Sequence, residues 1–334
     1  MSQVVNGHRD ISETLRSLYA PIREQLAEVE AILHGELHSD SPQVDRLVKH
    51  GFRLGGKRLR PALVLLTGMA CGETGPDHLV LAAAMELIHT ATLIHDDVLD
   101  EADLRRHLET VNARWDNEAS ILLGDYLLAR AICLASSVDD PTASREIGRA
   151  SRIMCEGELR QIVGCGDYDL TEQEYIEIIS GKTAELCACS CRVGAHYAGA
   201  SQELARTCGR YGANLGIAFQ IVDDLLDVLG DETTTGKSLG TDLLKQKMTL
   251  PLIRLLGLLK PVERETVVAL LSDPERQPRE AIQPWLARTD AIDYTRRKAE
   301  GYVQLAIEQL DAVPATPTRD VLRNLAQFVL ARQN

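Results

Sequence analysis

The sequence predicts an all-α protein built as a single large helical bundle, and three features of the chain support this prediction. Between Asp77 and Leu250 the only proline is Pro141, which permits long uninterrupted helices in that region. The region is rich in Ala, Leu, Glu and Arg, and it has no regular period-two alternation. Aromatic residues make up only 4% of the 334 residues, which argues against two sheets packed on aromatic strand residues.

Composition narrows the class of protein further. Hydrophobic residues make up 45% and charged residues 25%, the balance of an ordinary globular protein rather than a disordered chain. The formal net charge of −13 argues against a nucleic-acid partner, because binding a phosphate backbone needs a basic surface. An enzyme that binds anionic substrates would need metal ions or a local basic patch to offset the repulsion from this negative charge.

Targeting and cysteine signals indicate a cytoplasmic protein. No uninterrupted apolar stretch is long enough to span a bilayer. Residues 1–10 are polar and lack the basic segment and the apolar segment of a signal peptide. None of the eight cysteines forms a Cys-x-x-Cys pair. In the cluster Cys187, Cys189 and Cys191, the middle thiol would face away from the other two on a helix, which suits a tetrahedral metal site poorly. We expect reduced thiols that simply pack.

The first predicted elements lead to a central helix. Gly72 to Pro76 is expected to end one helix, and Asp77 to cap the next. The segment from Leu79 to Leu99 is apolar on nearly every face, as in a helix surrounded by others. Because no solenoid repeat or low-complexity linker is present, residues 1–334 are expected to form one domain, with residues 1–19 as a mobile N-terminal extension.

Further along the chain, turns and caps separate the expected helices. The segment 139–142 is expected to form a turn, and 164–170 a loop. Thr171 with Glu174 has the pattern of a capping box that opens another helix. The segment 230–241 is polar and punctuated by glycine, and it is suited to a movable flap.

Two Asp-Asp-x-x-Asp motifs carry the chemical signal. The first is His95-Asp96-Asp97-Val98-Leu99-Asp100, and the second is Asp223-Asp224-Leu225-Leu226-Asp227, preceded by Phe219-Gln220. On a helix the first and last carboxylates of each motif lie one turn apart and repel each other. One such motif alone would be read as a solvated helix end. Two of them, flanked by apolar residues, favour oxygen ligands for Mg²⁺ that also holds water and substrate phosphates.

Basic residues lie near both acidic motifs in an otherwise acidic chain. Two glycines adjoin the cations of the segment Gly55-Gly56-Lys57-Arg58-Leu59-Arg60-Pro61, so a phosphate can approach closely. The remaining candidates are Arg105, Arg106, Lys182 with Thr183, Lys237 and Lys247. Each alone would be ordinary solvated surface, but together they suggest a clamp for a diphosphate.

The order of these motifs resembles that of the trans-isoprenyl diphosphate synthases, in particular long-chain members such as the octaprenyl and heptaprenyl diphosphate synthases. The resemblance also includes Gly124-Asp125-Tyr126-Leu127-Leu128-Ala129-Arg130, Gly157-Glu158-Leu159-x-Gln161, Gly236-Lys237, Gly240-x-Asp242-Leu243 and Lys247-x-Thr249-Leu250-Pro251. It extends from about Ala20 to the C-terminus. It implies an all-helical bundle of the isoprenoid synthase type with a central active-site cavity, a requirement for Mg²⁺, and a homodimer.

The resemblance also implies a role for each matching residue. Mg²⁺, as three ions bound with the substrate diphosphate, is expected on Asp96, Asp100 and Asp223, with Asp97, Asp224 and Asp227 in support. The allylic diphosphate is expected on Arg105, Lys182 and Lys237, and isopentenyl diphosphate on Lys57, Arg60, His89 and Arg106. Lys247 is a further substrate-binding candidate. Lys182, Thr183 and Gln220 are the catalytic candidates, because their dipoles can face the transient allylic cation.

The expected substrates are isopentenyl diphosphate and an allylic diphosphate, farnesyl or geranylgeranyl. Chain length is expected to depend on the face of the central helix that descends from Asp96 through Thr92, Ala91, Ile88 and Met85. Short-chain members of the family place a bulky aromatic residue four or five positions before the motif, and here both positions are small. We therefore expect an all-trans product from hexaprenyl to decaprenyl, with geranylgeranyl as the alternative. Such a product would need no transmembrane segment in the enzyme, only peripheral membrane contact for its release.

Three positions depart from the family pattern: His107 stands for Gly, Glu109 for Pro, and Gln246 for the Gly before the late lysine. None of them removes an expected ligand. Three alternatives remain open. A class I terpene cyclase shares the first motif but needs no isopentenyl pocket, and a regulatory subunit of a heteromeric synthase should have lost some of these aspartates or cations. A generic helical scaffold would explain none of the motif order.

Overall fold

The computed structural model describes residues 13–53, 56–105, 107–229, 240–273 and 278–331. These residues are almost entirely helical, which confirms the predicted fold class. The chain divides into two compact units. Unit 1 consists of Met1–Ala150, Leu186–Gly212 and Gln309–Asn324, and unit 2 of Ser151–Glu185, Ala213–Glu308 and Leu325–Asn334. Whether they form the single domain expected from the sequence stays a prediction.

Unit 1 carries the N-terminal helices and a short hairpin. Residues 13–18 are helical, although they belong to the segment expected to be a mobile extension. The elements that follow are η1 (Ala20–Ile22), α2 (Arg23–Glu36), α3 (Pro42–Arg53), α4 (Leu59–Cys71), α5 (Pro76–Leu99), β1 (Leu104–Arg105), β2 (Leu108–Glu109), α6 (Val111–Arg114) and α7 (Asn117–Ser136). The first part of α8 (Thr142–Val163), most of α10 (Glu185–Tyr197), the start of α11 (Gln202–Leu229), η4 (Leu310–Ala312) and part of α18 (Pro317–Ala331) complete it.

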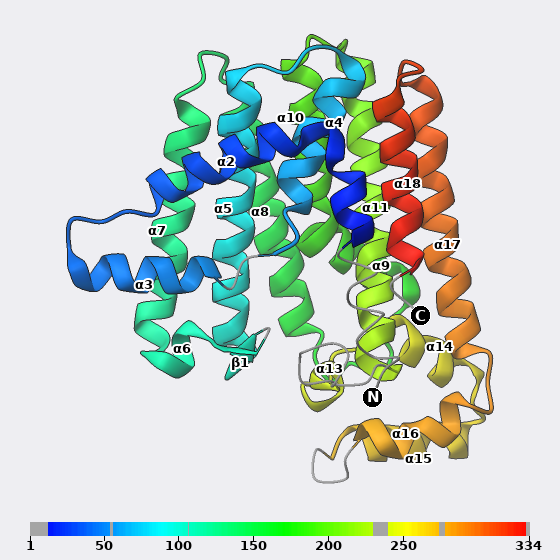
Figure 1. Cartoon of the computed structure of the whole chain (residues 1–334). Coiled ribbons are helices and arrows are strands. Elements are labelled where there is room, and N and C mark those ends of the chain that lie inside the picture. Colours follow the sequence, from blue (N-terminus) through cyan, green and yellow to red (C-terminus); the bar gives the residue numbers. More distant parts are fainter. Residues whose placement is uncertain (1–12, 54–55, 106, 230–239, 274–277, 332–334) are drawn as a thin grey trace. The chain divides into compact units, whose positions relative to one another are not determined.

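Helix α5 is the centre of unit 1. It packs against α2, α4 and α7, which Figure 1 shows beside it. Its side chains from Leu81 to Ile88 are all buried, as the apolar pattern on every face predicts. Full burial of each large aliphatic side chain contributes about 1.5–3 kcal/mol. The last turn of this rigid helix carries the first acidic motif, so the position of the motif is fixed by the core.

Unit 2 contains the remaining helices. They are the second part of α8, α9 (Glu172–Ile179), the π-helical turn η2 (Ser180–Ala184), most of α11, α13 (Thr241–Leu244), α14 (Leu250–Leu258), α15 (Pro261–Leu271), α16 (Pro278–Leu286) and α17 (Ala291–Gln309), with the end of α18. An apolar cluster that includes Val228, Leu243, Leu255, Val267 and Ile282 joins the end of α11 to α13–α16. The cluster holds the end of α11, which carries the second acidic motif.

The predicted helix boundaries agree with the structure in most places. The Thr171–Glu174 capping box is present: the Thr171 hydroxyl accepts from the Glu174 amide at 3.3 Å, and Glu174 accepts from the Thr171 amide at 2.9 Å. The expected cap at Asp77 is wrong. The cap residue is Gly75, and Pro76 occupies the first helical position, where its missing N–H costs nothing. Most of the expected flap, 230–239, lies outside the described residues.

Two helices, α5 and α7, are long and apolar enough to cross a membrane by length and composition alone. The search for an uninterrupted apolar stretch in the sequence did not identify them. In the structure, 67% of the most apolar window of α5 is buried, so α5 is a core helix. The cysteines form no disulfide. Burial raises the pKa of Cys187 and of Cys191, which keeps both thiols protonated, as expected for packing groups.

Candidate functional site

The first acidic motif lies at the C-terminal end of α5. Asp96 and Asp100 are half-buried and one turn apart, and the amide of Asp100 donates to the carbonyl of Asp96 at 2.7 Å. Asp97 faces the other way and is only 1% exposed. Because the C-terminus of a helix carries partial negative charge, its dipole adds to the field of these carboxylates and favours a cation there.

The carboxylate of Asp97 forms an ion pair with the guanidinium of Arg105. The Asp97 Oδ1 accepts from both Nε and Nη2 of Arg105, each at 2.7 Å. Arg105 belongs to the hairpin β1–β2, in which Leu104 pairs with Glu109 and Arg105 with Leu108. Its side chain is 16% exposed. Asp97 therefore anchors one of the expected diphosphate-binding cations to α5, and its role as a metal ligand stays a prediction.

Two of the three residues that depart from the family pattern have a left-handed backbone conformation. His107 has φ of 63° and Gln246 has φ of 53°, both in the left-handed region where glycine is favoured. The usual glycines at these two places would therefore fit the backbone. His107 is exposed at the tip of the hairpin, and Glu109 belongs to β2, where its carbonyl accepts from Nε2 of His50 at 2.8 Å.

The cations expected to bind isopentenyl diphosphate lie around the start of α4 in unit 1. Lys57 is exposed just before the helix, and Arg60 is half-buried in its first turn. His89 is half-buried on α5. Between the two cations, Arg58 has φ of 53° and caps the helix. Arg106, the fourth residue of this expected pocket, lies outside the described residues.

The residues expected to govern chain length are placed along α5 as the periodicity predicts. Ala91 is 3% exposed, Ile88 1% and Met85 0%, while Thr92 is half-buried and donates its hydroxyl to the carbonyl of His89 at 2.9 Å. The two positions nearest the motif therefore carry small side chains, and the two deeper positions carry large ones. Their role stays a prediction.

The second acidic motif belongs to a polar chain in unit 2 that is buried at Tyr175 and Asp224 and half-buried at Thr183 and Gln220. The hydroxyl of Thr183 donates to Oε1 of Gln220 at 2.8 Å, and Nε2 of Gln220 donates to Oδ1 of Asp224 at 2.6 Å. The hydroxyl of Tyr175 donates to Oδ2 of Asp224, also at 2.6 Å. Both oxygens of Asp224 thus have partners, while Asp223 is half-buried on the adjoining part of α11. Asp224 orients Gln220, and its expected supporting role at the metal stays a prediction.

The last carboxylate of this motif has an incomplete set of partners. Oδ1 of Asp227 accepts from the amide of Gly240 at 3.1 Å. Its Oδ2 is buried and has no hydrogen-bond partner among the described residues. Burial and the nearby charge of Asp242 raise the pKa of Asp227 to about 7, and the same two causes raise the pKa of Asp224 to about 7. Three carboxylates therefore repel one another in a partly dehydrated place.

The lysine of the Lys-Thr pair sits in the π-helical turn η2. Nζ of Lys182 donates to Oε1 of Gln161 at 2.6 Å and lies 3.6 Å from Oε2 of Glu158, both on α8. A Cβ at Gly157 would lie 2.5 Å from the amide nitrogen of Lys182, so only glycine lets α8 and η2 approach so closely. Such π-turns occur often at functional sites.

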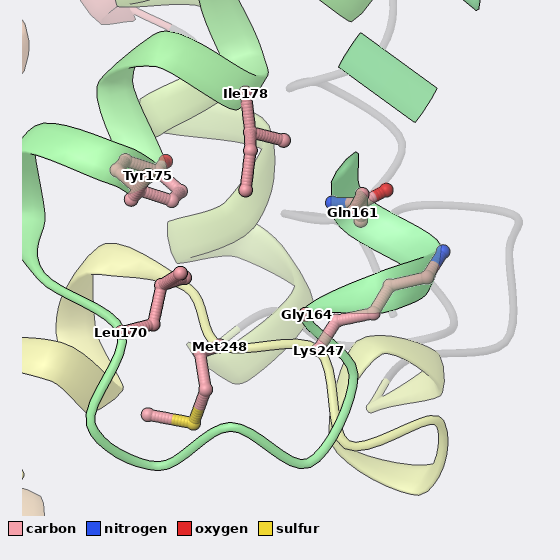
Figure 2. A pocket seen from close by; sticks show the side chains of 7 residues that line it. All are labelled: Gln161, Gly164, Leu170, Tyr175, Ile178, Lys247 and Met248. Carbon is pink, nitrogen blue, oxygen red and sulfur yellow. The ribbon is translucent and has the colours of Figure 1, made fainter. Parts of the chain in front are cut away.

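Lys247 borders a small cavity in unit 2 that Gln161, Tyr175 and Met248 also line (Figure 2). The cavity has a volume of about 10 Å³, which is room for no more than a single water molecule. It is therefore not a substrate pocket. Nζ of Lys247 is 3.8 Å from Oδ1 of Asp242. Lys237 lies outside the described residues.

The donor sets fit Mg²⁺. Among the described residues, no three His, Cys, Asp or Glu side chains gather into a complete metal cage. Mg²⁺ commonly takes only one or two carboxylates and completes its shell with water and substrate phosphates, so paired carboxylates suffice. The unpartnered Oδ2 of Asp227, beside further carboxylates, is an oxygen that a divalent cation would satisfy.

Sequence reasoning missed Tyr175 and gave Gln161 and Asp242 no individual role. Nothing in the sequence marks Tyr175 as functional, since a tyrosine at a core-facing position of a capped helix is ordinary. Its buried hydroxyl needs an acceptor, but the acceptor is 49 residues away in the sequence. The pairing of Asp97 with Arg105 was also missed, because it depends on the hairpin folding back onto α5.

Comparison with known proteins gives a consistent result. Residues 41–286 match the family described as Polyprenyl synthetase. The chain is 34% identical to the all-trans-nonaprenyl-diphosphate synthase (geranyl-diphosphate specific) of Rhodobacter capsulatus over 318 residues, covering 95% of this chain and 98% of that one. It is 35% identical to the octaprenyl diphosphate synthase of Escherichia coli over 312 residues, covering 92% and 96%. The crystal structure of a polyprenyl synthase from Caulobacter crescentus, complexed with calcium and isoprenyl diphosphate, matches with a TM-score of 0.89 at 35% identity, covering 96% and 98%.

Proposed function

This chain belongs to the polyprenyl synthetase family and is a prenyltransferase, and we propose that it condenses isopentenyl diphosphate head-to-tail with an allylic diphosphate in a Mg²⁺-dependent reaction. The primer would be farnesyl or geranylgeranyl diphosphate, and the product an all-trans polyprenyl diphosphate from hexaprenyl to decaprenyl. The observation that carries the proposal is the partly buried chain Thr183–Gln220–Asp224–Tyr175, because it joins expected catalytic dipoles to the second acidic motif.

The proposed chemistry begins with ionisation of the allylic C–O bond. The alkene of isopentenyl diphosphate then attacks the allylic cation, and the released diphosphate takes the final proton. Mg²⁺ held by Asp96, Asp100 and Asp223 would supply positive charge that offsets the leaving diphosphate. The hydroxyl of Thr183 and the amide of Gln220 would turn fixed dipoles toward the cation, and their mutual hydrogen bond means that little reorganisation is needed during the reaction.

The proposed clamp cations have fixed orientations. Arg105 is bound twice by Asp97, and Lys182 is bound by Gln161 with Glu158 nearby. A cation whose geometry is set by neighbours before the substrate arrives loses less side-chain entropy on binding. We propose that these two residues, with Lys237, hold the allylic diphosphate. The isopentenyl diphosphate would then be held by Lys57, Arg60, His89 and Arg106.

The product length rests on two supports. Thr92 and Ala91 offer no bulky side chain near the first motif, so a growing tail is not stopped at once. The relatives named above are nonaprenyl and octaprenyl diphosphate synthases. The large buried side chains of Ile88 and Met85 lie further down α5 and would form part of the floor.

The test is incubation with labelled isopentenyl diphosphate and a series of allylic primers, with and without Mg²⁺, followed by measurement of product length. The expected result is Mg²⁺-dependent elongation to six to ten isoprene units. Arrest at four units would favour the geranylgeranyl alternative. A cyclic hydrocarbon formed without isopentenyl diphosphate would indicate a terpene cyclase, and absence of any elongation by the chain alone would favour a regulatory subunit.

We also propose that the protein is a homodimer, and the surface of α7 supports this. One face of α7 packs on α5, and the opposite face exposes Ile121, Leu122 and Ile132, at 46%, 67% and 50%. Large apolar side chains exposed on the outer face of a helix favour an interface there. Leu122→Glu should shift the molar mass measured by light scattering from dimer to monomer. A monomeric wild type would contradict the proposal.

A cytoplasmic enzyme of this class would meet a membrane only when it releases its long apolar product. We propose peripheral contact of this kind. Cell fractionation should recover the enzyme in the supernatant, and vesicles should increase the rate of multiple turnovers. Recovery in the membrane fraction after a high-salt wash would contradict this.

A further inference from the structure

A strained residue lies between the two cations proposed to bind isopentenyl diphosphate. Arg58 has φ of 53°, and its neighbours are the exposed Lys57 and, two positions on, Arg60. A left-handed backbone costs a non-glycine residue about 1–2 kcal/mol, so surrounding contacts must hold it. The proposed function gives Arg58 itself no substrate to bind.

Three elements hold the Arg58 side chain. Its Nε and Nη2 donate to the two carboxylate oxygens of Glu30 on α2, at 2.5 and 3.3 Å. Its Nη1 donates to Oε1 of Glu86 on α5 at 2.7 Å. The guanidinium also lies 4.7 Å from the ring centroid of Phe52, at the end of α3. The turn that carries Lys57 is therefore tied to α2, α3 and α5 through one side chain.

Glu86 is the unusual member of this cluster. Its side chain is 0% exposed, although it lies on the central core helix. Burial raises the pKa of Glu86, and the charges of Arg58 and Arg60 oppose part of that rise. A buried carboxylate is a poor way to stabilise a fold, because packed apolar residues of similar volume often do so as well or better.

The second carboxylate oxygen of Glu86 indicates that this residue has a role other than stabilising the fold. Oε2 of Glu86 is buried and has no hydrogen-bond partner among the described residues, and the same is true of Nε of Arg60. Arg60 lies two residues after Arg58, in the first turn of α4. His89 follows Glu86 by three residues on α5 and so lies on the same helix face. Glu86 thus contacts the residue that follows Lys57 and precedes Arg60 by two positions, and it shares a helix face with His89.

We propose that Glu86 is a positioning residue for isopentenyl diphosphate: through its bond to Arg58 it fixes the left-handed turn that presents Lys57 and begins the helix that carries Arg60. The inference rests on the proposed function and adds a residue to it. Glu30 supports the same guanidinium from α2, where it is partly exposed. Misplacing a binding group by about 1 Å can lower a rate by about a hundredfold, so fixing the turn that presents Lys57 matters for binding.

The test compares Glu86→Gln with a matched control, Glu146→Gln. Glu146 accepts from Nε of Arg192 at 2.8 Å and ties α8 to α10 within unit 1, away from Arg58. For Glu86→Gln we expect a rise of about tenfold or more in KM for isopentenyl diphosphate, with kcat and KM for the allylic substrate changed less than threefold. The control should leave both KM values unchanged, whatever it does to the melting temperature.

A second variant and a binding measurement keep the inference open to refutation if Glu86→Gln folds poorly. Glu30→Gln should raise KM for isopentenyl diphosphate less than Glu86→Gln does. Calorimetric titration with isopentenyl diphosphate alone, without an allylic primer, should give weaker binding for both variants. Equal rises in both KM values, or unchanged binding by well-folded variants, would overturn the positioning role. If the wild type neither binds nor condenses isopentenyl diphosphate, the proposed function itself fails.

Discussion

Replacement of Tyr175 by Phe removes one hydroxyl from the buried end of the polar chain of unit 2. Tyr175 is 2% exposed, and its hydroxyl donates to Oδ2 of Asp224 at 2.6 Å. The ring remains and no cavity forms. The variant therefore isolates a hydrogen bond to a carboxylate that is itself only 4% exposed.

The size of the effect follows from the charge and burial of the acceptor, measured at pH 8.5, above the pKa of about 7 to which Asp224 is raised, so that its carboxylate is ionised. A hydrogen bond to a charged group contributes about 1.5–3 kcal/mol, against about 1 kcal/mol for a neutral pair. We expect the free energy of unfolding to fall by about 2 kcal/mol. Asp224 would keep only its bond from Gln220, and the loosened Gln220 would orient Thr183 less well. We expect kcat to fall about tenfold, which corresponds to about 1.4 kcal/mol.

The assay combines urea unfolding with steady-state kinetics. The control is Tyr211→Phe, since the buried hydroxyl of Tyr211 donates to a neutral acceptor, the carbonyl of Leu322, at 2.8 Å in unit 1. This control should lose about 1 kcal/mol of stability and keep its kcat. If the two variants lose equal stability and both keep full kcat, Tyr175 is only a packing residue and the reasoning about the polar chain is wrong.

Three further predictions concern pockets, chain length and pH. Arg60→Ala should raise KM mainly for isopentenyl diphosphate, and Lys237→Ala should raise KM mainly for the allylic substrate. Steady-state kinetics with each substrate varied in turn measures both values, and the assignment of the two pockets would be contradicted if both variants affected the KM of the same substrate. Ala91→Phe should shorten the product to farnesyl or geranylgeranyl diphosphate without abolishing condensation, and an unchanged product distribution in chromatography would contradict the chain-length face. The pKa of Asp140 is lowered to about 2 by hydrogen bonds from His196 and Thr142. Because this value is below that of the unfolded chain, the stabilisation exists above about pH 4 and is lost as the pH falls toward 2. The melting temperature of Asp140→Asn should therefore lie below that of the wild type at pH 6 but not at pH 2, and a constant difference would refute the assignment.

The central helix and the motif positions could be predicted because their signals are local. The apolar pattern of residues 79–99 is dense enough to place α5 in the core, and the spacing within each motif puts paired carboxylates on one helix face. The capping box at Thr171 could also be predicted, since its two partners are three residues apart.

The contacts that orient the site could not be predicted in the same way. Tyr175 with Asp224, and Arg58 with Glu30 and Glu86, pair across 28 to 49 residues of sequence, and only tertiary packing brings them together. The π-helical turn at Lys182 has no sequence pattern that distinguishes it from ordinary helix. The cap of α5 was misplaced because the preference for a proline in the first helical turn outweighed the capping preference of Asp77.

The role of the two acidic motifs is tested most directly by product formation by the wild type, Asp96→Asn and Asp223→Asn in the presence of Mg²⁺, with labelled isopentenyl diphosphate and farnesyl diphosphate. Each substitution keeps the size of the side chain and removes one negative charge, so the helices should stay intact. The wild type should form polyprenyl diphosphates of six to ten units, and each variant should lose several orders of magnitude in turnover with helicity unchanged by circular dichroism. Near-normal condensation by either variant would contradict the role of the two acidic motifs.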